Sequence, residues 1–475
     1  MSSPPVEGNP TPSLPQSFIR LGVGEAAARL IAFVTTFVIA RRLGTEGLGV
    51  VSFAFAILLY LQRVVDAGFD LGIGIREAAK RRQHLRDFVP PVLTFRFVLA
   101  AATIGLVMLA AVLIRQVEGD MIVLYALTLI PLALSTRWVL TGMGMTGAVG
   151  LSRAVGEAVV LIVVFLVVSN QADLWRVPVS QLLGDTVAAL LLLMVLHQHG
   201  IPSSLRWNSN TVRPLVRHVA PYVGSALLGL AIFNSDLLFL RAFADRATVG
   251  LYAAAYALVS FLINVGATYS LTLIPSLAQL SDEPLARQSV YATAWARALA
   301  IVVPVAAGGA LVAQQAITVV FGAAFAPAGI VLMVLLISVP LSVLRSIAVS
   351  ALMAQGREDI LFRTVLIAAS VNIALNFVAV PAFGMLGAAT VTVLTELLRL
   401  VLAQRYAASL GVRAPELQRH WKTALATLSM AGAVALGFRQ SIVATVAIGV
   451  VVYAVALLAV RGIGRDANGR MELQV

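Results

Sequence analysis

The chain has 475 residues, of which 60% are hydrophobic and only 12% are charged, and its mean hydropathy is +0.93. Soluble domains carry about 25% charged residues, so this composition excludes a soluble globular protein and indicates a polytopic membrane protein. The formal net charge is +12, but the arginines are spread over short stretches between apolar runs, which speaks against a nucleic-acid partner.

Missing residue types narrow the chemistry further. The sequence contains no cysteine, which excludes disulfides, thiol catalysis and thiolate metal sites. Its two lysines, Lys80 and Lys422, do not follow glycine, so the chain has no Walker A loop for ATP. We therefore expect a protein that is not an enzyme, has no cofactor or metal centre, and does not hydrolyse ATP.

In chain order, residues 1–17 are rich in proline and polar side chains, and we interpret them as a disordered cytoplasmic tail. Fourteen apolar runs follow, each long enough for a membrane helix of about 20 residues. They cover residues 18–40, 48–67, 90–114, 121–143, 148–169, 177–196, 219–240, 248–277, 291–313, 327–353, 360–380, 384–407, 420–438 and 441–460.

The basic residues predict the orientation of these helices. An even number of crossings puts both termini on one side of the bilayer. With the amino terminus inside, most basic residues of the connecting stretches fall on the cytoplasmic side, among them Arg76, Lys80, Arg213, Arg357 and Arg419. This asymmetry follows the positive-inside rule. We predict a multi-pass protein of the cell inner membrane with both termini cytoplasmic.

The two halves of the chain match each other. An offset of 201 aligns the stretch from Gly49 with the stretch from Gly250 and sets Arg96 on Arg297, and an offset of 211 sets Asp185 on Glu396. Chance alignment of glycine- and alanine-rich sequence is the alternative, but it does not readily match charges inside membrane helices. We predict an all-α polytopic membrane protein of two six-helix lobes with two added C-terminal helices.

This interpretation divides the chain into six regions. They are the tail at 1–17, an N-lobe of helices 1–6 at 18–199, a cytoplasmic linker at 200–218, a C-lobe of helices 7–12 at 219–409, helices 13 and 14 at 420–460, and a cytoplasmic tail at 461–475.

Four stretches carry a family resemblance. They are Arg41–Gly49, Asp66–Gly68 followed by Arg76–Glu77, Asp236 with Gly250–Tyr252, and Pro381–Ala389. In this order and spacing, over residues 18–407, they resemble the polysaccharide and O-antigen flippases of the multidrug/oligosaccharidyl-lipid/polysaccharide exporter superfamily.

The resemblance implies a V-shaped two-lobe transporter that moves an undecaprenyl-pyrophosphate-linked oligosaccharide to the outer leaflet by alternating access. Helices 13 and 14 depart from the common twelve-helix pattern and leave the subfamily open, because the lipid II flippases of peptidoglycan synthesis also have fourteen. A polysaccharide polymerase and glycosyltransferases are the further partners that this role implies, beside the phospholipid bilayer.

Charges at membrane depth are the candidate site residues, because each costs several kcal/mol to insert. Glu25 and Arg29 stand one turn apart on helix 1 and form either an intrahelical ion pair or a phosphate contact with an orienting carboxylate. Four further arginines are candidate ligands of a pyrophosphate, which a guanidinium binds with two parallel hydrogen bonds: Arg96, Arg137, Arg297 and Arg345. For Arg96 and Arg297, snorkelling to lipid headgroups is the alternative.

The acidic candidates are Asp185 and Asp236, which, with Glu25, serve either charge pairing or coupling to a cation, H⁺ or Na⁺. Asp185 has no basic residue near it in sequence, whereas Asp236 has Arg241 five positions on.

Three functions compete on these observations. A lipid-linked oligosaccharide flippase fits the repeat, the excess of intramembrane arginine and the motifs. A cation-coupled multidrug exporter of the same superfamily should have mainly acidic cavity charges. A polyprenyl-dependent glycosyltransferase or ligase needs catalytic carboxylates or a large outer loop, and the predicted outer loops are short.

Overall fold

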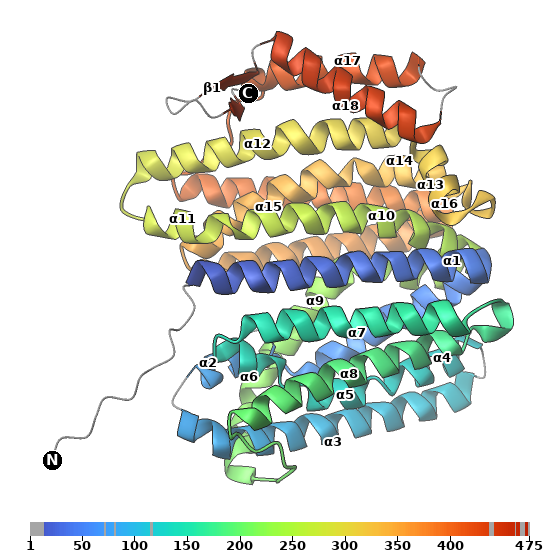
Figure 1. Cartoon of the computed structure of the whole chain (residues 1–475), viewed down its shortest axis with the longest axis vertical. Coiled ribbons are helices and arrows are strands. Elements are labelled where there is room, and N and C mark those ends of the chain that lie inside the picture. The colour runs from blue at the N-terminus through green and yellow to red at the C-terminus, as the bar shows by residue number, and fades with distance from the viewer. Residues whose placement is uncertain are drawn as a thin grey trace. The chain divides into compact units, whose positions relative to one another are not determined.

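The structure is a computed structural model that describes residues 14–70, 73–79, 82–114, 117–436, 441–460, 462–465 and 471–473. Helices make up nearly all of the described chain (Figure 1). A lipid environment offers backbone groups no hydrogen-bonding partners, so a chain this apolar satisfies them inside helices. The predicted all-α polytopic membrane fold is confirmed.

The chain forms two compact units, which are described separately below. Unit 1 comprises residues 1–38 and 57–226, and unit 2 comprises residues 39–56 and 227–475. Two helices run through both units: α1 (Leu14–Asp66) and α9 (Ser209–Phe243).

Unit 1 also contains α2 (Ile73–Ala78), α3 (Arg82–Ile114), α4 (Val117–Ala126), α5 (Leu129–Leu134), α6 (Arg137–Gly142), α7 (Thr146–Val167), the short 3₁₀ helix η1 (Gln171–Asp173) and α8 (Arg176–Gln198). Its core surrounds Trp138, which has no exposed surface and whose ring lies 5.5 Å from that of Phe69 and 6.0 Å from that of Phe88. The region predicted as one helix at 121–143 consists of three shorter helices, α4 to α6.

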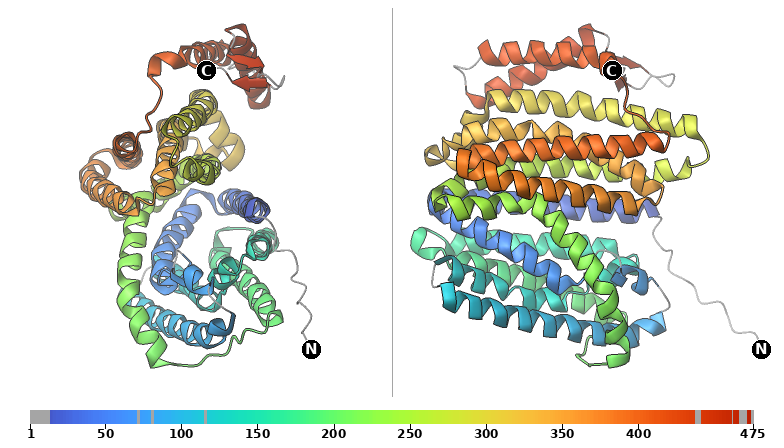
Figure 2. Two further views of the ribbon diagram at one scale, coloured as in Figure 1. Left: turned by 90° about the vertical axis from the view of Figure 1, so that its left-hand side faces the viewer. Right: turned by 180° about the vertical axis from the view of Figure 1, so that it is seen from behind.

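Unit 2 contains α10 (Arg246–Leu271), α11 (Leu273–Gln279), α12 (Pro284–Leu311), α13 (Ala313–Phe321), η2 (Ala323–Phe325), α14 (Ala328–Leu336), α15 (Ser338–Ala354), α16 (Glu358–Ser409), η3 (Leu417–His420), α17 (Trp421–Leu436) and α18 (Ile442–Ala459). The end-on view in Figure 2 shows α17 and α18 beside α12, where Met430 and Val434 pack with Val312. The short strands β1 (Ile463–Arg465) and β2 (Met471–Leu473) pair antiparallel, with Ile463 opposite Leu473.

Ten helical segments of the described chain are long and apolar enough to cross a membrane. Two of them, Gly22–Asp66 and Asp359–Ser409, have 45 and 51 residues, enough for two crossings each at about 20 residues per crossing. Each contains a non-helical glycine, Gly44 (φ 69°) or Gly384 (φ 55°), in the left-handed region where a side chain is strained. These glycines turn the chain between predicted helices, and the total of fourteen helices is compatible with this arrangement.

Segment 39–56 of α1 joins unit 2 through a reciprocal contact with α10. A Cβ placed on Gly49 would lie 1.9 Å from the carbonyl oxygen of Arg246, and one placed on Gly250 would lie 1.9 Å from that of Thr45. The offset of 201 that aligns Gly49 with Gly250 also aligns Thr45 with Arg246. Only glycine allows this approach, so the sequence repeat corresponds to a contact that is symmetric in the structure.

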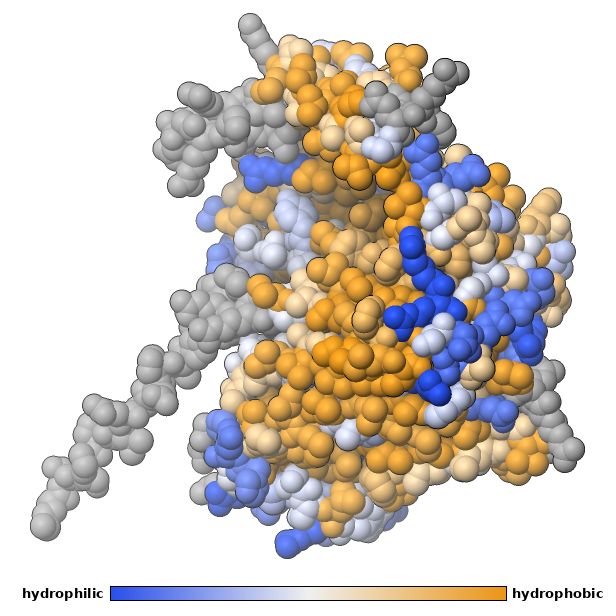
Figure 3. All heavy atoms as spheres, turned by 45° about the vertical axis from the view of Figure 1, so that its right-hand side comes forward, coloured by the Kyte–Doolittle hydropathy of each residue, from blue (hydrophilic) through white to orange (hydrophobic). Residues whose placement is uncertain are grey.

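Figure 3 shows apolar side chains across the middle of the helices and hydrophilic ones gathered toward their ends. Helices that cross a bilayer have this pattern, because their middles contact hydrocarbon and their ends contact water and lipid headgroups.

Candidate functional site

The candidate site begins in unit 1, where charged side chains from three helices meet around Glu25 of α1. The Nη2 of Arg137, the first residue of α6, donates to Glu25 Oε1 at 2.8 Å, and Arg153 Nε of α7 lies 3.7 Å from Oε2. Arg29, one turn further along α1, is exposed and within electrostatic reach of all three residues. We call Glu25, Arg29, Arg137 and Arg153 the Glu25 cluster.

Close helix packing brings these residues together. A Cβ on Gly24 would lie 2.6 Å from the backbone of Gly150, so α1 can approach α7 only because Gly24 has no side chain. Glu25 acts electrostatically on Arg29, the pair that the sequence suggested, and its carboxylate also forms ion pairs with Arg137 and Arg153.

The Glu25 cluster carries excess positive charge that remains accessible. Three guanidinium groups surround one carboxylate, and the half-buried Glu157 nearby still leaves the balance positive. The side chains of Arg137 and Arg153 are 36% and 42% exposed, against 19% for Glu25. The guanidinium groups of Arg137 and Arg153 therefore remain accessible to an anion while they are ion-paired with Glu25.

Asp185 lies elsewhere in unit 1, half-buried on α8. Among the described residues, its carboxylate accepts a hydrogen bond from Gln181 Nε2 at 3.1 Å, one turn earlier on the same helix. This carboxylate therefore lacks a close basic partner in the described chain.

Arg96 has a different role from the accessible arginines. It has no exposed surface, and its Nη2 lies 3.4 Å from Asp66 Oδ1. Its Nη1 and Nη2 also donate, each at 3.0 Å, to the carbonyl oxygens of Ser135 and Leu132. These carbonyls lie where the predicted helix 4 breaks between α5 and α6, so Arg96 satisfies backbone groups that the break exposes.

Arg297 on α12, the residue aligned with Arg96, is exposed. The two arginines share a place in the repeat but not an environment. The geometry of Arg96 fits structural support and not a shared phosphate site.

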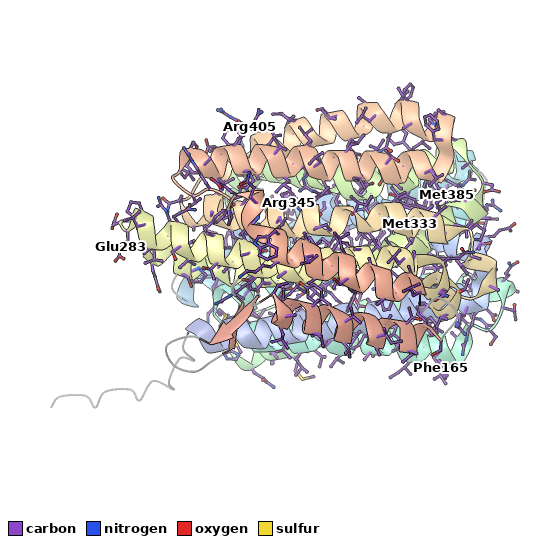
Figure 4. All side chains as sticks on the ribbon, turned by 90° about the horizontal axis from the view of Figure 1, so that it is seen from above. Phe165, Glu283, Met333, Arg345, Met385 and Arg405 are labelled. Carbon is purple, nitrogen blue, oxygen red and sulfur yellow. The ribbon has the colours of Figure 1, made fainter. Side chains whose placement is uncertain are left out.

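Arg345 belongs to a buried ion cluster in unit 2. Its Nε lies 2.9 Å from Glu396 Oε2, which also accepts a hydrogen bond from the Ser342 hydroxyl at 2.6 Å, and Arg399 Nη1 binds Glu396 Oε1. Figure 4 shows Arg345 along the middle of the helices, with Glu283 and Arg405 toward one end and Met385 toward the other. Its side chain is 11% exposed, so this guanidinium is committed to Glu396.

Asp236 on α9 forms a second buried network in unit 2. Its Oδ2 accepts hydrogen bonds from the hydroxyls of Tyr252 and Thr392, both at 2.6 Å, and its Oδ1 accepts one from Asn376 Nδ2 at 2.8 Å. Asn376 also donates to Asn372 Oδ1 at 3.1 Å, and the carbonyl oxygen of the Asn376 side chain is buried without a partner.

This network has no basic member. Asp236 is 1% exposed, and none of the described residues forms an ion pair with it, although the sequence suggested Arg241. Three helices are joined, since Ser235 of α9 donates to Asn372 and the network includes α10 and the parts of α16 on both sides of Gly384. The result is a buried carboxyl group held by hydroxyl and amide groups.

Sequence reasoning missed Arg153 as a member of the site and missed the partners of Asp236. The signals existed: Asn372 and Asn376 are four apart, hence on one face of a helix, and Tyr252 lies inside the Gly250–Tyr252 motif. What the sequence lacked was the pairing of helices far apart in the chain.

Residues 14–281 match the model of the family described as "Polysaccharide biosynthesis protein". The chain belongs to this family. A probable low-salt glycan biosynthesis flippase, Agl15 of Haloferax volcanii, is 25% identical over 445 residues, which is 90% of each chain. The resemblance to the polysaccharide flippases is therefore confirmed.

Solved structures share the fold. The inward closed conformation of the lipid II flippase MurJ is similar over 93% of the present chain and 99% of the MurJ chain. The TM-score is 0.79 and the sequence identity is 13%. The inward-facing conformation of a multidrug resistance MATE family transporter of the MOP superfamily matches 83% and 98% with a TM-score of 0.65 at 14% identity. At such identities the likeness shows the fold, a multi-pass transporter architecture, and not the substrate.

Proposed function

We propose that the protein flips an undecaprenyl-pyrophosphate-linked oligosaccharide from the cytoplasmic to the outer leaflet by alternating access, in the synthesis of cell-surface polysaccharide. The observation that carries this proposal is the Glu25 cluster, with its three accessible arginines around one carboxylate. The family match and the glycan flippase among the relatives support it.

The chemistry of the cluster suits a pyrophosphate. A guanidinium stays charged at any physiological pH and offers two parallel donors to phosphate oxygens. Arg29, Arg137 and Arg153 come from three helices, so an anion between them would contact all three helices at once. Glu25 orients Arg137 through a hydrogen bond, and its negative charge lowers the cost of holding three positive charges together before the substrate arrives.

Arg96 and Arg345 are not part of this proposal, because they already form buried ion pairs with Asp66 and Glu396. Arg297 remains a predicted second contact in unit 2. Asp185 remains a predicted coupling group of unit 1.

We further propose that Asp236 is the coupling site, where a proton or Na⁺ binds and is released during the transport cycle. A buried carboxylate without a counter-ion is costly, and binding a cation removes this cost. The oxygens of Asp236, Thr392 and Asn376 are hard donors that suit Na⁺, and Asp236 can equally take up a proton.

Binding of undecaprenyl pyrophosphate tests the anion site. Each charge-assisted contact contributes about 1.5–3 kcal/mol, so Arg137→Ala and Arg153→Ala should each weaken binding by roughly tenfold to a hundredfold. Arg176→Ala is the matched control, because Arg176 is 39% exposed in unit 1 and ion-paired to Asp173 at 2.8 Å. Native mass spectrometry of the protein in nanodiscs measures the affinities. Equal affinity in all three variants would remove the cluster from the substrate site.

Flipping in liposomes tests the coupling. We expect transport that follows an imposed proton or Na⁺ gradient without ATP, and Asp236→Asn should abolish that dependence while undecaprenyl pyrophosphate still binds. Transport that requires ATP and ignores every gradient would contradict the proposal.

Two alternatives remain within the same fold. A lipid II flippase would use the same anion site, and competition between lipid II and other undecaprenyl-pyrophosphate glycans distinguishes the two. A multidrug exporter for cationic drugs is disfavoured, because the accessible charges of the Glu25 cluster are mainly positive.

The predicted topology and partners belong to the same proposal. Reporter fusions after Gly119, Val177 and Gly384 should lie outside the cell, and fusions after Arg82, Asn208 and Gly411 inside, with both termini cytoplasmic. A polysaccharide polymerase and glycosyltransferases are the partners that a flippase of this kind would serve.

A further inference from the structure

Polar side chains recur at every fourth position of α10 in unit 2. They belong to Tyr252, Tyr256, Ser260, Asn264 and Thr268, which we call the α10 stripe. Positions four apart lie one above the other on nearly the same face of a helix, so these side chains form one continuous row. At 1.5 Å per residue the row is about 24 Å long, which is most of the roughly 30 Å of a bilayer's hydrocarbon core.

The α10 stripe leaves the core of unit 2 along its length. At one end Tyr252 is 1% exposed, and its hydroxyl donates to Asp236 Oδ2 at 2.6 Å. The three residues that follow are half-buried, and Thr268 at the other end is exposed. The later part of the stripe is therefore accessible to a ligand.

The opposite side of α10 packs on α15. A Cβ on Gly266 would lie 2.2 Å from Val343 Cγ2, and the Ser350 hydroxyl donates to the carbonyl oxygen of Ser270 at 2.7 Å. Successive helical residues turn by about 100°, so Asn264, two positions before Gly266, points away from α15. The stripe is thus not part of the packing between these two helices.

Local hydrogen bonds hold the polar groups of the stripe in place. The Ser260 hydroxyl donates to the carbonyl oxygen of Ala257 at 3.1 Å, Asn264 Nδ2 donates to that of Ser260 at 2.8 Å, and the Thr268 hydroxyl donates to that of Asn264 at 3.0 Å. A hydroxyl that donates still has lone pairs that accept, and an amide has two donors and two acceptors. Hydrocarbon offers no partners to such groups, whereas a ligand rich in hydroxyl groups does.

The repeat shows that the stripe belongs to unit 2 alone. The offset of 201 sets Val51, Phe55, Leu59, Arg63 and Ala67 against its five members. Four of these residues are apolar, so the corresponding segment of α1 has no row of hydrogen-bonding groups. The repeated helix therefore does not need polar side chains at these positions.

A cation lies near the exposed end of the stripe. Arg297 of α12 is exposed and acts electrostatically on Tyr269, which follows Thr268 and is 36% exposed. Neutral hydroxyl and amide groups beside a guanidinium complement a glycan that is joined to a pyrophosphate, since sugars present hydroxyl groups and the pyrophosphate presents negative charge.

We propose that the α10 stripe is a track for the glycan part of the substrate, where Ser260, Asn264 and Thr268 hydrogen-bond sugar hydroxyls while the glycan crosses the membrane. This inference rests on the proposed function and adds to it the part of the substrate that unit 2 contacts. Neutral hydrogen bonds exchanged with water contribute little each, which suits a ligand that must move along the row and be released.

Binding of two lipids, measured by native mass spectrometry in nanodiscs, tests the track. The probes are undecaprenyl pyrophosphate and the same lipid with the glycan that it carries in the cells of origin. We expect the wild type to prefer the glycan-bearing lipid. Asn264→Leu should weaken binding of that lipid by roughly twofold to tenfold and leave binding of undecaprenyl pyrophosphate unchanged. Ser260→Ala combined with Thr268→Val should have the same selective effect, and Asn264→Gln should keep most of the preference because it keeps the amide.

Ser270→Ala is the matched control, because the Ser270 hydroxyl also donates to its own helix, to the carbonyl oxygen of Gly266 at 3.1 Å, but on the side of α10 that faces α15. It should leave the preference unchanged. Equal binding of both lipids by the wild type, or equal weakening of both by Asn264→Leu, would overturn the track. Binding of neither lipid would overturn the proposed function and this inference with it, whereas unchanged affinities in Arg137→Ala and Arg153→Ala would concern the Glu25 cluster only.

Discussion

Units 1 and 2 differ in how they hold their charged side chains. In unit 1 the Glu25 cluster presents accessible arginines, with Arg137 and Arg153 more than one-third exposed. In unit 2 the charges are buried: Glu396 is neutralised by Arg345 and Arg399, and Asp236 lies in a network of hydroxyl and amide groups.

Residues that the predicted repeat aligns have different surroundings in the two units. Asp185 and Glu396 align, but the first has one amide partner and the second has two arginines and a serine. Arg96 and Arg297 align, but one is buried and the other exposed. The aligned positions thus do not share one chemistry, and we propose anion binding in unit 1 and cation coupling at Asp236 of unit 2.

The largest expected effect comes from removing the charge of Glu396. Glu396→Gln would leave Arg345 and Arg399 buried without a counter-charge, which costs about 3–5 kcal/mol for a buried pair. At the aligned position, Asp185→Asn should change the free energy of unfolding by less than about 1 kcal/mol, because no arginine depends on it. Unfolding by sodium dodecyl sulfate in mixed micelles measures both. Equal losses would show that the two units use these carboxylates alike.

The aligned arginines should differ in the same direction. Arg96→Ala removes the partner of Asp66 and two hydrogen bonds to backbone carbonyls, so we expect a loss of about 3 kcal/mol, as for a broken buried pair. Arg297→Ala should cost less than about 1 kcal/mol, since exposed ion pairs contribute little. The same unfolding assay compares the two variants. A large loss for Arg297→Ala alone would reverse our assignment of Arg96 as the structural residue.

Composition and hydropathy were enough to predict the fold class, because a bilayer permits a chain this apolar only a bundle of helices. The repeat was visible because Gly49 and Gly250 have a steric reason to be glycine. The partners of the charges were not visible. Glu25 binds Arg137, 112 positions away, because helix packing sets that contact and local spacing does not.

Arg96 shows the same limit. Its burial depends on a helix break at 135–136 that leaves carbonyls free, and no proline or glycine stands there to predict it. The sequence indicated how deep Arg96 lies in the membrane. It did not indicate which face of the helix carries Arg96 or which groups Arg96 contacts.

The repeat itself can be tested at its symmetric contact. Gly49→Ala and Gly250→Ala each place a Cβ 1.9 Å from a backbone oxygen, so the helices must separate, at a cost of about 1–3 kcal/mol. The two losses should be similar, because the contact is reciprocal. Gly105→Ala is the control: nothing lies within 4 Å of its Cβ, and it should stabilise by about 0.5–1 kcal/mol. Thermal unfolding in detergent reports all three, and unequal losses at Gly49 and Gly250 would argue against the symmetry.

The smallest expected effect lies at the start of α10, outside the membrane-spanning segment. Asp245 caps this helix by accepting the Thr248 backbone N–H at 2.8 Å, and hydrogen bonds from Thr248 lower the pKa of its carboxyl. A lowered folded-state pKa means that the stabilisation is present above the unfolded-state pKa and is lost as pH falls through the folded-state value.

Asp245→Ala should cost about 1 kcal/mol at neutral pH, the usual size for an N-cap. Asp245→Asn should retain most of the cap and lose its pH dependence, since the amide oxygen still accepts the hydrogen bond but does not titrate. Unfolding measured from neutral to acidic pH checks this, and an Asp245→Asn variant that weakens with acid as steeply as the wild type would assign the acid sensitivity to another group.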